Sequence, residues 1–560
     1  MSVEAGLSLQ PDAARYTLPA FLDDVAARHG QRVALVFENR SLTFVALRGR
    51  VRSLARALIA KGVGRGTHVA LLVSNRPEWV VSAFAVALAG GVVVPVSTFA
   101  TAEERTHVLR HADAELLILQ PSLLKHRYLD DLIACEPEKA LPSLRQVIVL
   151  DGAEGGVPAL RTALTIESWD EAVRAAERVP EPDLDLRARA VTPEDDAMIV
   201  YTSGSTAEPK GVLHTQRAAV IQSWRFAEFL GLAPHDTVWT AYPLFWTAGF
   251  AMSLGASLAA GATLLLEETF EAEQALATIE RHHATAIHAW PHQEKALAEH
   301  PAAASRDLRS IAQVNLSSPL APLAGITEDR WGRSATYGLT ETFTLVTAIP
   351  ATAPAAERRA NHGRVLPGCE LRIVDPESGA LLDANQEGEI AVRGLTLMRG
   401  YHKVPRESTF DAEGFFHTGD SGRIDAMGKL HWHGRMTGMI KTGGANVSPV
   451  EIENQLRSFP GLRAAVAVGV RHASLGEIVV LCAVAEPGAN ADNGSVTEAD
   501  VRAYLRARLA AYKVPKRVLF FAHDEVAFTG TQKIQAAPLR EAALARLKAE
   551  HCVIEGVAYS

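Results

Sequence analysis

Residues 201–211 read Tyr201-Thr202-Ser203-Gly204-Ser205-Thr206-Ala207-Glu208-Pro209-Lys210-Gly211, a stretch made almost entirely of hydroxyl residues, glycine and one lysine. The apolar run Ala197-Met198-Ile199-Val200 comes just before it and predicts a buried strand that leads into a loop. Small residues allow backbone N–H groups to turn inward and form a concave site for an anion. The side chains of Thr202, Ser203, Ser205 and Thr206 add hydroxyl donors, and Lys210 adds a positive charge. The stretch therefore predicts a loop that holds a polyphosphate.

This loop is not a Walker motif, because Lys210 is followed by Gly211 where that motif has Ser or Thr, and the glycine spacing differs. A flexible Ser/Gly connection between two elements is the alternative for such a cluster. Four hydroxyls placed between a strand and the Pro209-Lys210-Gly211 turn favour the anion-binding interpretation.

On both sides of the loop, short apolar strands alternate with segments of helical periodicity, which indicates parallel βαβ units. The predicted strands are 32–37, 69–73, 92–96, 114–119, 237–241 and 262–266, and the predicted helices are 18–28, 41–62, 79–89, 102–111, 218–230, 250–259 and 271–282. Residues 152–195 are richer in charge and proline and are expected to form a peripheral excursion. The fold class is therefore α/β, with a large N-terminal domain of βαβ-type sheets flanked by helices.

The pattern changes after Gly363, where residues 370–375 and 388–393 predict short alternating strands of a small β subdomain. From Glu451 onward, the order of helix, two strands, helix and strand predicts a small α+β domain. We expect an N-terminal domain at 1–434 and a mobile C-terminal domain at 435–560. A chain of 560 residues exceeds what one core usually organises, so two domains agree with its length.

Composition narrows the class of protein. A net charge of −8 argues against a general nucleic-acid binder, so any anionic ligand must be met by a local site. The four cysteines lie far apart and show no metal-binding or disulfide spacing, which fits a reducing cytoplasm. No signal peptide is apparent. The uncharged stretch 237–266 is long enough to span a bilayer, but Pro243, Gly249, Gly255 and Gly261 interrupt it, which favours a loop, a buried helix and a strand.

Further polar motifs follow along the chain, and each has a structural alternative when taken by itself. Tyr337-Gly338-Leu339-Thr340-Glu341-Thr342 offers a flat ring, a hydroxyl and a carboxylate for Mg²⁺. Asp420 in Thr418-Gly419-Asp420 suits a ribose diol, but the motif taken by itself is better interpreted as an Asx-turn. Gly434-Arg435 and Gly443-Gly444 precede Ser448-Pro449-Val450-Glu451, which also predicts a helix capping box. Lys533 lies in a predicted turn.

His431-Trp432-His433 places two imidazoles on one face of a predicted strand. A metal site is conceivable, but no third ligand is near in sequence, so a half-exposed strand is the better interpretation. His282-His283 is expected to mark a helix end. The sequence shows neither a Ser-His-Asp nor a Cys-His pattern for nucleophilic catalysis.

Taken together, the motifs at 201–211, 337–342, 418–420, 434–435 and 443–444 resemble those of the adenylate-forming superfamily, which includes acyl-CoA synthetases. The resemblance covers nearly the whole chain. It implies an ATP-dependent acid–thiol ligase that uses ATP, Mg²⁺ and coenzyme A. Such an enzyme first makes an acyl-AMP with release of pyrophosphate and then transfers the acyl group to coenzyme A.

The resemblance also implies roles for individual residues. Thr202, Ser203, Gly204, Ser205, Thr206 and Lys210 would hold the β- and γ-phosphates. Ser317, Ser318, Pro319, Tyr337 and Gly338 would border the adenine, Asp420 and Arg435 the ribose, and Gly443 and Gly444 the pantetheine channel. Thr340 would contact the α-phosphate, Glu341 would bind Mg²⁺, and Lys533 would bridge the carboxylate and the α-phosphate; these three are the candidate catalytic residues.

The chain departs from the family pattern at several positions. Ala207 and Gln532 stand where the family usually has glycine, and Gly438 stands where it usually has Asp. Thr437 occupies the hinge position, and Trp246 stands where many relatives have His. Thr437 and Gly438 predict a looser hinge. Because a Trp side chain cannot exchange protons, any gating by Trp246 would be steric. A free-standing enzyme that loads a carrier protein and a catalytically degenerate nucleotide-binding relative remain alternatives.

The acid pocket is expected at Phe245, Trp246, Gly249, His288 and Leu339, which are mostly small, apolar or aromatic. This composition predicts an apolar acid, and Trp246 favours an aryl, cyclic or medium-chain one. The expected partners are therefore a small carboxylic acid and coenzyme A, with neither nucleic acid nor a membrane span.

Overall fold

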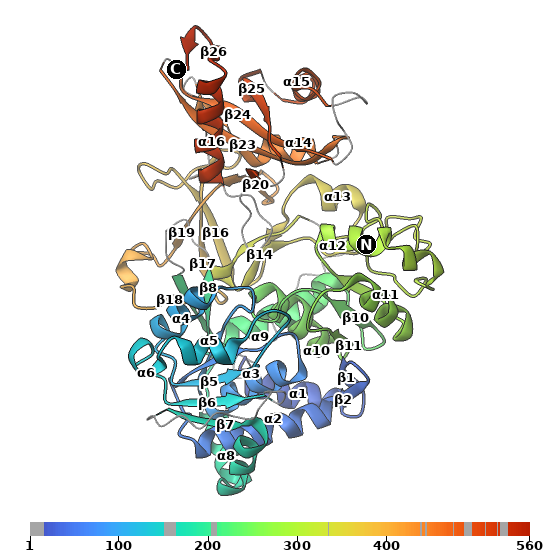
Figure 1. Cartoon of the computed structure of the whole chain (residues 1–560), viewed down its shortest axis with the longest axis vertical. Coiled ribbons are helices and arrows are strands. Elements are labelled where there is room, and N and C mark those ends of the chain that lie inside the picture. The colour runs from blue at the N-terminus through green and yellow to red at the C-terminus, as the bar shows by residue number, and fades with distance from the viewer. Residues whose placement is uncertain are drawn as a thin grey trace. The chain divides into compact units, whose positions relative to one another are not determined.

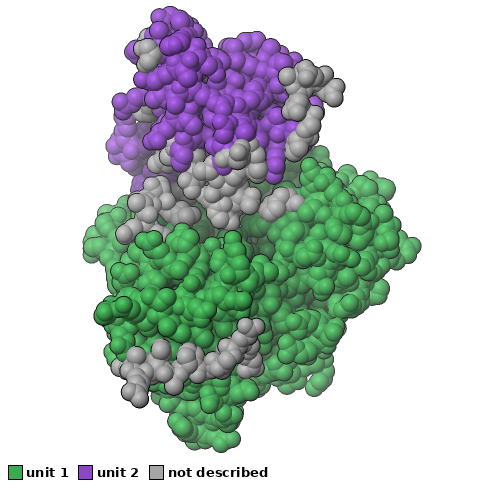
Figure 2. All heavy atoms as spheres, viewed as in Figure 1, with its two compact units in different colours: residues 1–371, 392–416, 428–430 green, residues 372–391, 417–427, 431–560 purple. Residues whose placement is uncertain are grey.

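The computed structural model describes residues 16–150, 164–202, 210–333, 335–436, 440–442, 445–447, 449–457, 459–473, 475–486, 496–509, 511–522, 525–526 and 536–559. The chain divides into two compact units (Figure 2). Unit 1 comprises Met1–Leu371, Val392–Phe416 and Gly428–Leu430, and unit 2 comprises Arg372–Ala391, His417–Met427 and His431–Ser560. Each unit is described below by itself.

Unit 1 contains an eight-stranded sheet (Figure 1). Its strand order is β18 (Gly400–Tyr401), β9 (Lys210–Thr215), β8 (Asp196–Thr202), β4 (Val92–Pro95), β3 (His68–Leu72), β5 (Leu116–Leu119), β6 (Gln146–Val149) and β7 (Thr165–Ser168). The strands from β8 to β7 are parallel, whereas β9 and β18 add an antiparallel edge. The phosphate loop therefore connects the last parallel strand to this edge.

A second sheet of unit 1 has the order β12 (Ala286–His288), β10 (Thr237–Thr240), β11 (Thr263–Leu266), β1 (Val33–Phe37) and β2 (Arg40–Thr43). Its first four strands are parallel and β2 closes the edge as a hairpin with β1. Parallel strands end at the same edge of a sheet, so the loops after β10 and β12 are neighbours.

Helices cover both faces of the eight-stranded sheet and of the five-stranded sheet in unit 1. The central core holds α1 (Leu18–His29), α2 (Phe44–Ala60), α3 (Pro77–Ala89), α9 (Gln216–Leu230), the π-helix η3 (Gly249–Gly255) and α10 (Ala256–Ala260). Val69 and Leu71 of β3 face this core, whereas Ala70 and Leu72 face α4 (Ala102–His111) and α5 (Tyr128–Ala134). In the second sheet, the outer face packs on α11 (Ala272–Arg281) and α12 (Pro291–Glu299). Successive side chains of a strand point to opposite faces of the sheet, so each strand contributes to two separate cores.

Shorter elements complete unit 1: α6 (Pro137–Ala140), α7 (Trp169–Arg174), η2 (Ala175–Arg178), α8 (Glu181–Ala190), η4 (Pro301–Ser305) and α13 (Ala355–Ala360). A three-stranded sheet joins β13 (Tyr337–Leu339), β14 (Thr344–Ala348) and β15 (Arg364–Val365), with the 3-10 turn η5 (Thr340–Thr342) between the first two strands. The η6 turn spans Arg406–Ser408.

The β subdomain expected after Gly363 is a four-stranded sheet of β16 (Cys369–Val374), β17 (Gly388–Gly394), β19 (Phe416–Ile424) and β20 (Leu430–Arg435). Unit 2 also holds β21 (Ile440–Thr442), β22 (Ala445–Val447), β23 (Leu462–His472), β24 (Gly476–Ala485) and β25 (Arg517–Phe520) in one sheet. One face of that sheet packs on α14 (Pro449–Leu456) and α15 (Glu498–Arg506), and the other on α16 (Ala536–Ala549). η8 (Ala511–Lys513) and the hairpin β26 (Val553–Ile554) and β27 (Val557–Ala558) complete the unit.

The α/β fold class with a large first unit and a small α+β unit is confirmed. The boundary after residue 434 stays a prediction. Two local expectations were wrong. Residues 41–43 end strand β2 before α2 begins. Residues 164–195 are not merely peripheral, because β7 extends the sheet and Ala172 and Leu184 are fully buried in the central core. The helix expected at 250–259 is present as η3 followed by α10, and its first part is a π-helix.

The uncharged stretch 237–266 forms β10, η3, α10 and β11. Among the described residues, no helix combines the length and the apolar composition needed to cross a bilayer. All four cysteines have free thiols, as their spacing predicts.

Candidate functional site

The predicted phosphate loop joins two antiparallel strands, because Thr202 ends β8 and pairs with Lys210, the first residue of β9. Tyr201 pairs with Gly211 in the same register. Thr202 is half-buried and Lys210 is exposed. The predicted ligands Ser203, Gly204, Ser205 and Thr206 lie outside the described residues. Both ends of the loop are therefore held by a strand pairing that leaves the Lys210 side chain accessible.

Lys210 and Glu341 meet around a tyrosine that sequence reasoning missed. The Lys210 Nζ lies 5.1 Å from the centre of the Tyr401 ring, and the Tyr401 hydroxyl donates a hydrogen bond of 2.7 Å to Glu341 Oε1. Tyr401 reaches this place because β18 pairs with β9, with Tyr401 opposite Val212. The Met398 N–H also donates to the Glu341 carbonyl at 2.8 Å. Two motifs 130 residues apart are thus brought together.

The 337–342 motif forms the tip of the β13–β14 hairpin. Thr342 is buried, accepts the Leu339 N–H at 3.0 Å and donates to the Thr344 carbonyl at 2.7 Å. At Gly338, a Cβ would lie 1.7 Å from the Thr344 carbonyl oxygen, so only glycine fits. Tyr337 is buried, while Thr340 and Glu341 remain half-exposed at the tip. The turn therefore presents one hydroxyl and one carboxylate on a rigid base.

The base of this turn packs on helix α9 and strand β9. Gln222 donates to the carbonyls of Thr342 and Leu345 at 3.0 and 2.8 Å. Phe343 is fully buried and meets the His214 ring edge-on, with ring centres 4.8 Å apart. Burial lowers the pKa of His214 to about 3, so this imidazole is neutral. These contacts fix the position of Thr340 and Glu341 relative to β9.

The predicted adenine-lining residues form a turn in unit 1. Ser317 and Pro319 are exposed, whereas Ser318 is buried and donates to Glu294 Oε2 at 2.6 Å. Ser318 Oγ also accepts the Leu320 N–H at 3.3 Å. The Ser318 hydroxyl is thus committed to the turn, and Ser317 and Pro319 are the positions that face outward.

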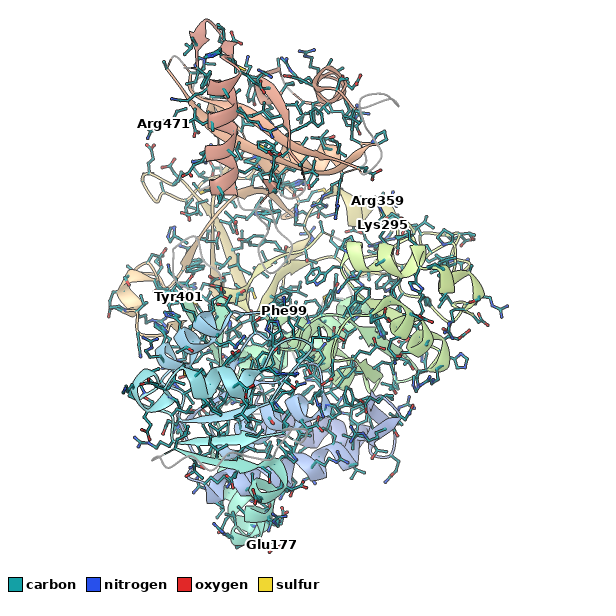
Figure 3. All side chains as sticks on the ribbon, in the orientation of Figure 1. Phe99, Glu177, Lys295, Arg359, Tyr401 and Arg471 are labelled. Atoms are coloured by element: carbon teal, nitrogen blue, oxygen red, sulfur yellow. The ribbon has the colours of Figure 1, made fainter. Side chains whose placement is uncertain are left out.

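The predicted acid pocket lies in a cluster of aromatic rings. The Phe99 ring contacts Phe245 and Trp246 at 5.4 and 6.0 Å between centres, and Trp246 contacts Trp290 at 6.5 Å. Trp290 in turn lies 4.5 Å from Tyr242. These residues follow β4 of the eight-stranded sheet and β10 and β12 of the second sheet, so the cluster lies beyond the carboxyl ends of strands from both sheets. Phe99, 55% exposed, is the open end of the cluster and is labelled with Tyr401 in Figure 3; both lie far from Glu177.

A buried asparagine side chain and a glycine hold the loop that carries Phe245 and Trp246. Buried Asn75 donates to the Tyr242 carbonyl at 3.0 Å and accepts the Leu244 N–H at 2.9 Å. At Gly249, a Cβ would lie 1.9 Å from the Pro243 carbonyl oxygen, so the π-helix can start only at a glycine. His288 is 1% exposed and bonds Ser253 of this π-helix, and Leu339 is half-buried at the end of β13.

Histidines gather beside strands β8 and β9. His402 lies 5.5 Å from both His68 and His111, and His111 Nδ1 lies 2.8 Å from the Tyr201 hydroxyl. The pKa of His402 is lowered to about 4 by burial and then by the neighbouring His68, His111 and Lys403. The His402 ring is therefore neutral near pH 7.

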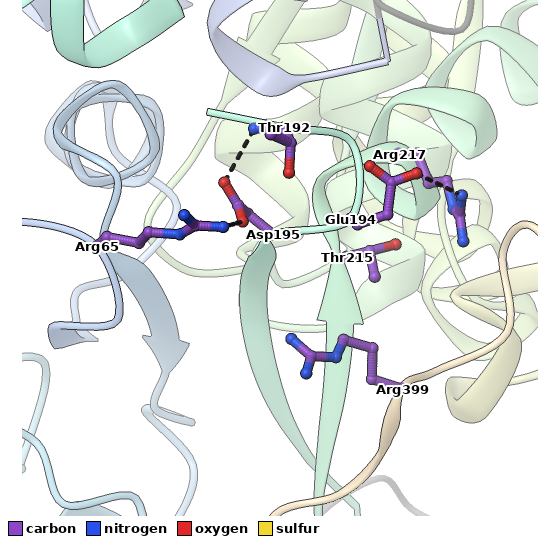
Figure 4. A pocket seen from close by; sticks show the side chains of 7 residues that line it. All are labelled: Arg65, Thr192, Glu194, Asp195, Thr215, Arg217 and Arg399. Atoms are coloured by element: carbon purple, nitrogen blue, oxygen red, sulfur yellow. Dashed lines mark hydrogen bonds and ion pairs between the residues drawn. The ribbon is translucent and has the colours of Figure 1, made fainter. Parts of the chain in front are cut away.

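A polar cavity of about 410 Å³ lies at the far end of β9 from Lys210 (Figure 4). It is lined by Arg65, Thr192, Glu194, Asp195, Thr215, Arg217 and Arg399. Its three guanidiniums pair with Asp195, Glu194 and Asp196, respectively. None of the predicted site residues lines it, and its charges are already neutralised, so it is not the candidate active site.

The remaining predicted residues belong to unit 2. Asp420 is buried within β19, and Gly419 before it has a positive φ of 69° and donates to Glu389 at 2.8 Å. Arg435 ends β20, and its side chain lies outside the described atoms. Gly443, Gly444 and Lys533 lie outside the described residues. The Thr418-Gly419-Asp420 motif is therefore a strand segment, which disfavours the Asx-turn alternative.

Among the described residues, no group of three or more His, Cys, Asp or Glu side chains could hold a metal ion. His431 bonds Asp425 at 2.9 Å and His433 bonds Glu387 at 3.0 Å, both on strand β20. The interpretation of 431–433 as a half-exposed strand is confirmed. His282 caps the end of α11, also as predicted.

Sequence reasoning missed Tyr401, Phe99 and Tyr242. Phe99 and Tyr242 follow the predicted strands 92–96 and 237–241, so the rule that ligands bind beyond the carboxyl ends of parallel strands could have found them. Tyr401 had no such signal, because β18 is two residues long and adds to the sheet edge from a distant part of the chain.

The model for a family described as AMP-binding enzyme matches residues 22–402, and the model for the AMP-binding enzyme C-terminal domain matches residues 451–533. A 7a-methyl-1,5-dioxo-octahydro-1H-inden-4-yl propanoyl:CoA ligase from Mycobacterium tuberculosis is 32% identical over 533 residues, with 94% of this chain and 98% of the relative covered. An indoleacetate–CoA ligase from Aromatoleum aromaticum is 30% identical, with coverage of 94% and 98%. The ATP-bound MatB structure from Rhodopseudomonas palustris superposes with a TM-score of 0.75 at 26% identity, covering 94% and 98% of the two chains.

Proposed function

Because this chain belongs to the AMP-binding enzyme family and is an AMP-forming acid–CoA ligase, we propose that its substrate is a cyclic or aryl carboxylic acid. The arrangement that carries this proposal is the aromatic cluster of Phe99, Phe245, Trp246 and Trp290, placed in the same unit as Lys210 and Glu341. Planar rings pack well against aromatic side chains. Relatives that act on a bicyclic acid and on indoleacetate support the same class.

The reaction activates a poor acyl donor. One carboxylate oxygen of the acid attacks the α-phosphorus of ATP, pyrophosphate leaves, and an acyl-AMP forms. The thiolate of coenzyme A then attacks the acyl carbon, and AMP leaves with the bonding electrons. The first step needs alignment and neutralisation of charge more than a nucleophilic side chain.

We assign the phosphate contacts to the β8–β9 loop and Lys210. The exposed ammonium is held over the Tyr401 ring, which limits its directions without neutralising it. Thr340 at the tip of the turn would donate to the α-phosphate. Tyr337 and the exposed residues Ser317 and Pro319 would border the adenine. The motifs of unit 2 support the proposed roles of Asp420 and Arg435 for the ribose, Gly443 and Gly444 for pantetheine, and Lys533 for the first step.

The residues around Glu341 fit Mg²⁺. Glu341 offers a half-exposed carboxylate whose Oε1 is oriented by Tyr401, so its other oxygen remains for a cation. Mg²⁺ prefers oxygen ligands and is commonly held by one or two carboxylates together with substrate phosphates. Glu341 would therefore hold an ion that neutralises charge on the triphosphate.

The reduced state of the four cysteines supports a cytoplasmic location.

Pyrophosphate exchange tests the proposal directly. We expect labelled pyrophosphate to enter ATP only when a cyclic or aryl acid is present, with linear acids of equal carbon number at least about tenfold slower in kcat/KM. Coenzyme A and a phosphopantetheinylated carrier protein are then compared as acceptors. Exchange with linear acids alone would contradict the substrate class, and preference for the carrier protein would identify a loading enzyme. Nucleotide binding without exchange for any acid would identify a degenerate relative.

A further inference from the structure

A buried hydrogen-bond chain ends at His288, next to the aromatic cluster. Thr240, Ser253 and His288 are each 1% exposed or less. Ser253 Oγ lies 2.9 Å from Thr240 Oγ1 and 3.0 Å from His288 Nδ1, and Thr240 Oγ1 accepts the Tyr242 N–H at 3.1 Å. The three residues come from β10, the π-helix and β12. A π-helical segment within a helix frequently lies at a functional site.

The direction of this chain follows from counting protons. If Thr240 donates to Ser253 and Ser253 donates to His288 Nδ1, both hydroxyl protons have an acceptor. In the reverse direction Thr240 Oγ1 accepts two bonds and its own proton has no acceptor among the described residues. The first direction therefore holds, and the proton of the neutral imidazole sits on Nε2.

Among the residues that the structure describes, His288 Nε2 has no hydrogen-bond partner, although the atom is fully buried. An unsatisfied buried donor costs about 1–3 kcal/mol, so native proteins rarely retain one without a use. Burial, and then the nearby Arg333 charge, hold the pKa of His288 well below its usual value. The ring is thus a fixed neutral donor.

The surroundings of His288 connect it to the open end of the cluster. The ring stacks on Tyr242 with centres 6.2 Å apart, and Tyr242 leads through Trp290 and Trp246 to exposed Phe99. Arg333 Nη1 donates to the Tyr242 hydroxyl at 2.8 Å, which holds that ring in place. If the ring system of the acid packs along these side chains, its far end is directed toward the buried His288 Nε2–H.

We propose that His288 Nε2–H donates a hydrogen bond to an acceptor oxygen on the ring system of the acid, such as a ketone or ether oxygen. The inference rests on the proposed function and refines it: the substrate is a cyclic acid with an acceptor, not a wholly apolar one. A site built to bond such an oxygen rejects the analogue that lacks it, because the donor is then left unpaired.

Matched acids test the proposal in the full-length enzyme. The probes are the ortho, meta and para isomers of methoxyphenylpropanoic acid, each paired with its ethyl isostere, and 3-(4-oxocyclohexyl)propanoic acid, paired with its methylidene isostere. The readout is the ratio of kcat/KM within each pair in pyrophosphate exchange. We expect at least one pair in which the oxygen-bearing acid is preferred by about tenfold.

Variants separate donor chemistry from structure. His288→Phe should bring the ratio close to one, and His288→Gln, which keeps an N–H donor, should retain part of the preference. Ser253→Ala should reduce the ratio, because the tautomer is no longer fixed. His214→Phe, another fully buried histidine of unit 1, should not change the ratio.

Each outcome bears on the proposal. Absence of any preference in the wild type, an unchanged ratio in His288→Phe, or equal loss for both acids of a pair would overturn it. Should His288→Phe fail to fold, the ratios of His288→Gln and Ser253→Ala decide in the same way. Absence of exchange with every acid would instead refute the proposed function, so the two failures are distinguishable.

Discussion

The hydroxyl of Tyr401 lies 2.7 Å from Glu341 Oε1, and the same ring lies beneath the Lys210 ammonium. One side chain thus orients the proposed Mg²⁺ ligand and the proposed phosphate-binding cation. The contact exists because β18 pairs with β9, which places Tyr401 beside the end of the phosphate loop.

Tyr401→Phe should lower kcat/KM for ATP by about 10- to 100-fold, because a hydrogen bond to a charged group is removed while the ring under Lys210 stays. The Mg²⁺ concentration for half-maximal exchange should rise. Tyr559→Phe is the matched control, since its hydroxyl donates to the Arg471 carbonyl at 3.0 Å in unit 2. Unchanged Mg²⁺ dependence in Tyr401→Phe would contradict the role of this contact.

Gly338→Ala should destabilise the protein by about 1–3 kcal/mol and displace the turn, because the added Cβ meets the Thr344 carbonyl oxygen. Activity should fall further than stability explains, since Thr340 and Glu341 move with the turn. Gly49→Ala is the comparison: that glycine is exposed inside α2, has no atom within 4 Å of its would-be Cβ, and should gain about 0.5–1 kcal/mol. Urea unfolding and exchange assays measure both effects. Equal stability of the two variants would refute the steric argument.

His402 should make the enzyme lose stability below neutral pH. Its pKa is lowered in the folded state to about 4 from 6.5, because the ring is buried and faces His68, His111 and Lys403, with only Asp113 acting in the other direction. The unfolded chain therefore binds a proton more readily between these values. The stabilising contribution is complete above pH 6.5 and is lost as the pH falls toward 4.

His402→Asn should flatten the pH dependence of the free energy of unfolding in that window, by at most about 1.4 kcal/mol per pH unit for one proton. His235→Asn, an exposed histidine of unit 1, should leave the slope as it is. Chemical unfolding at half-unit steps from pH 4 to 8 measures both slopes. A His402→Asn slope equal to that of the wild type would show that other groups dominate.

Lys533→Ala should abolish acyl-AMP formation but leave thioester formation from supplied acyl-AMP largely intact. In its proposed role this lysine neutralises charge where the carboxylate approaches the α-phosphate, and the second step has no such meeting of anions. Lys548→Ala, an exposed lysine of α16, is the control for charge loss in unit 2. Single-turnover assays of the two half-reactions decide, and equal loss in both would refute the assignment.

Much of the fold was accessible from sequence because it depends on local periodicity. Strands such as 69–73 and 92–96 and helices such as 102–111 carry a pattern of period 2 or 3.6 that any parallel α/β sheet requires. The site motifs were also local: hydroxyls and one lysine after an apolar strand are sufficient to indicate a phosphate loop. These features are properties of a few consecutive residues.

The elements that periodicity could not predict are those made by partners far along the chain. Strand β18 is only two residues long, and its pairing with β9 comes from residues almost 190 positions later. The π-helix η3 begins at Gly249, where the close approach of the Pro243 carbonyl leaves no room for a Cβ, and this approach is made by the tertiary fold.

The sequence by itself determined which chemical groups this protein has and the order in which its strands and helices follow, because those depend on neighbours in the chain. Only the tertiary structure decided that Tyr401 meets Glu341 and that His288 retains a buried donor. Both facts depend on the register of strands that are distant in sequence, and register is set by packing of the whole unit.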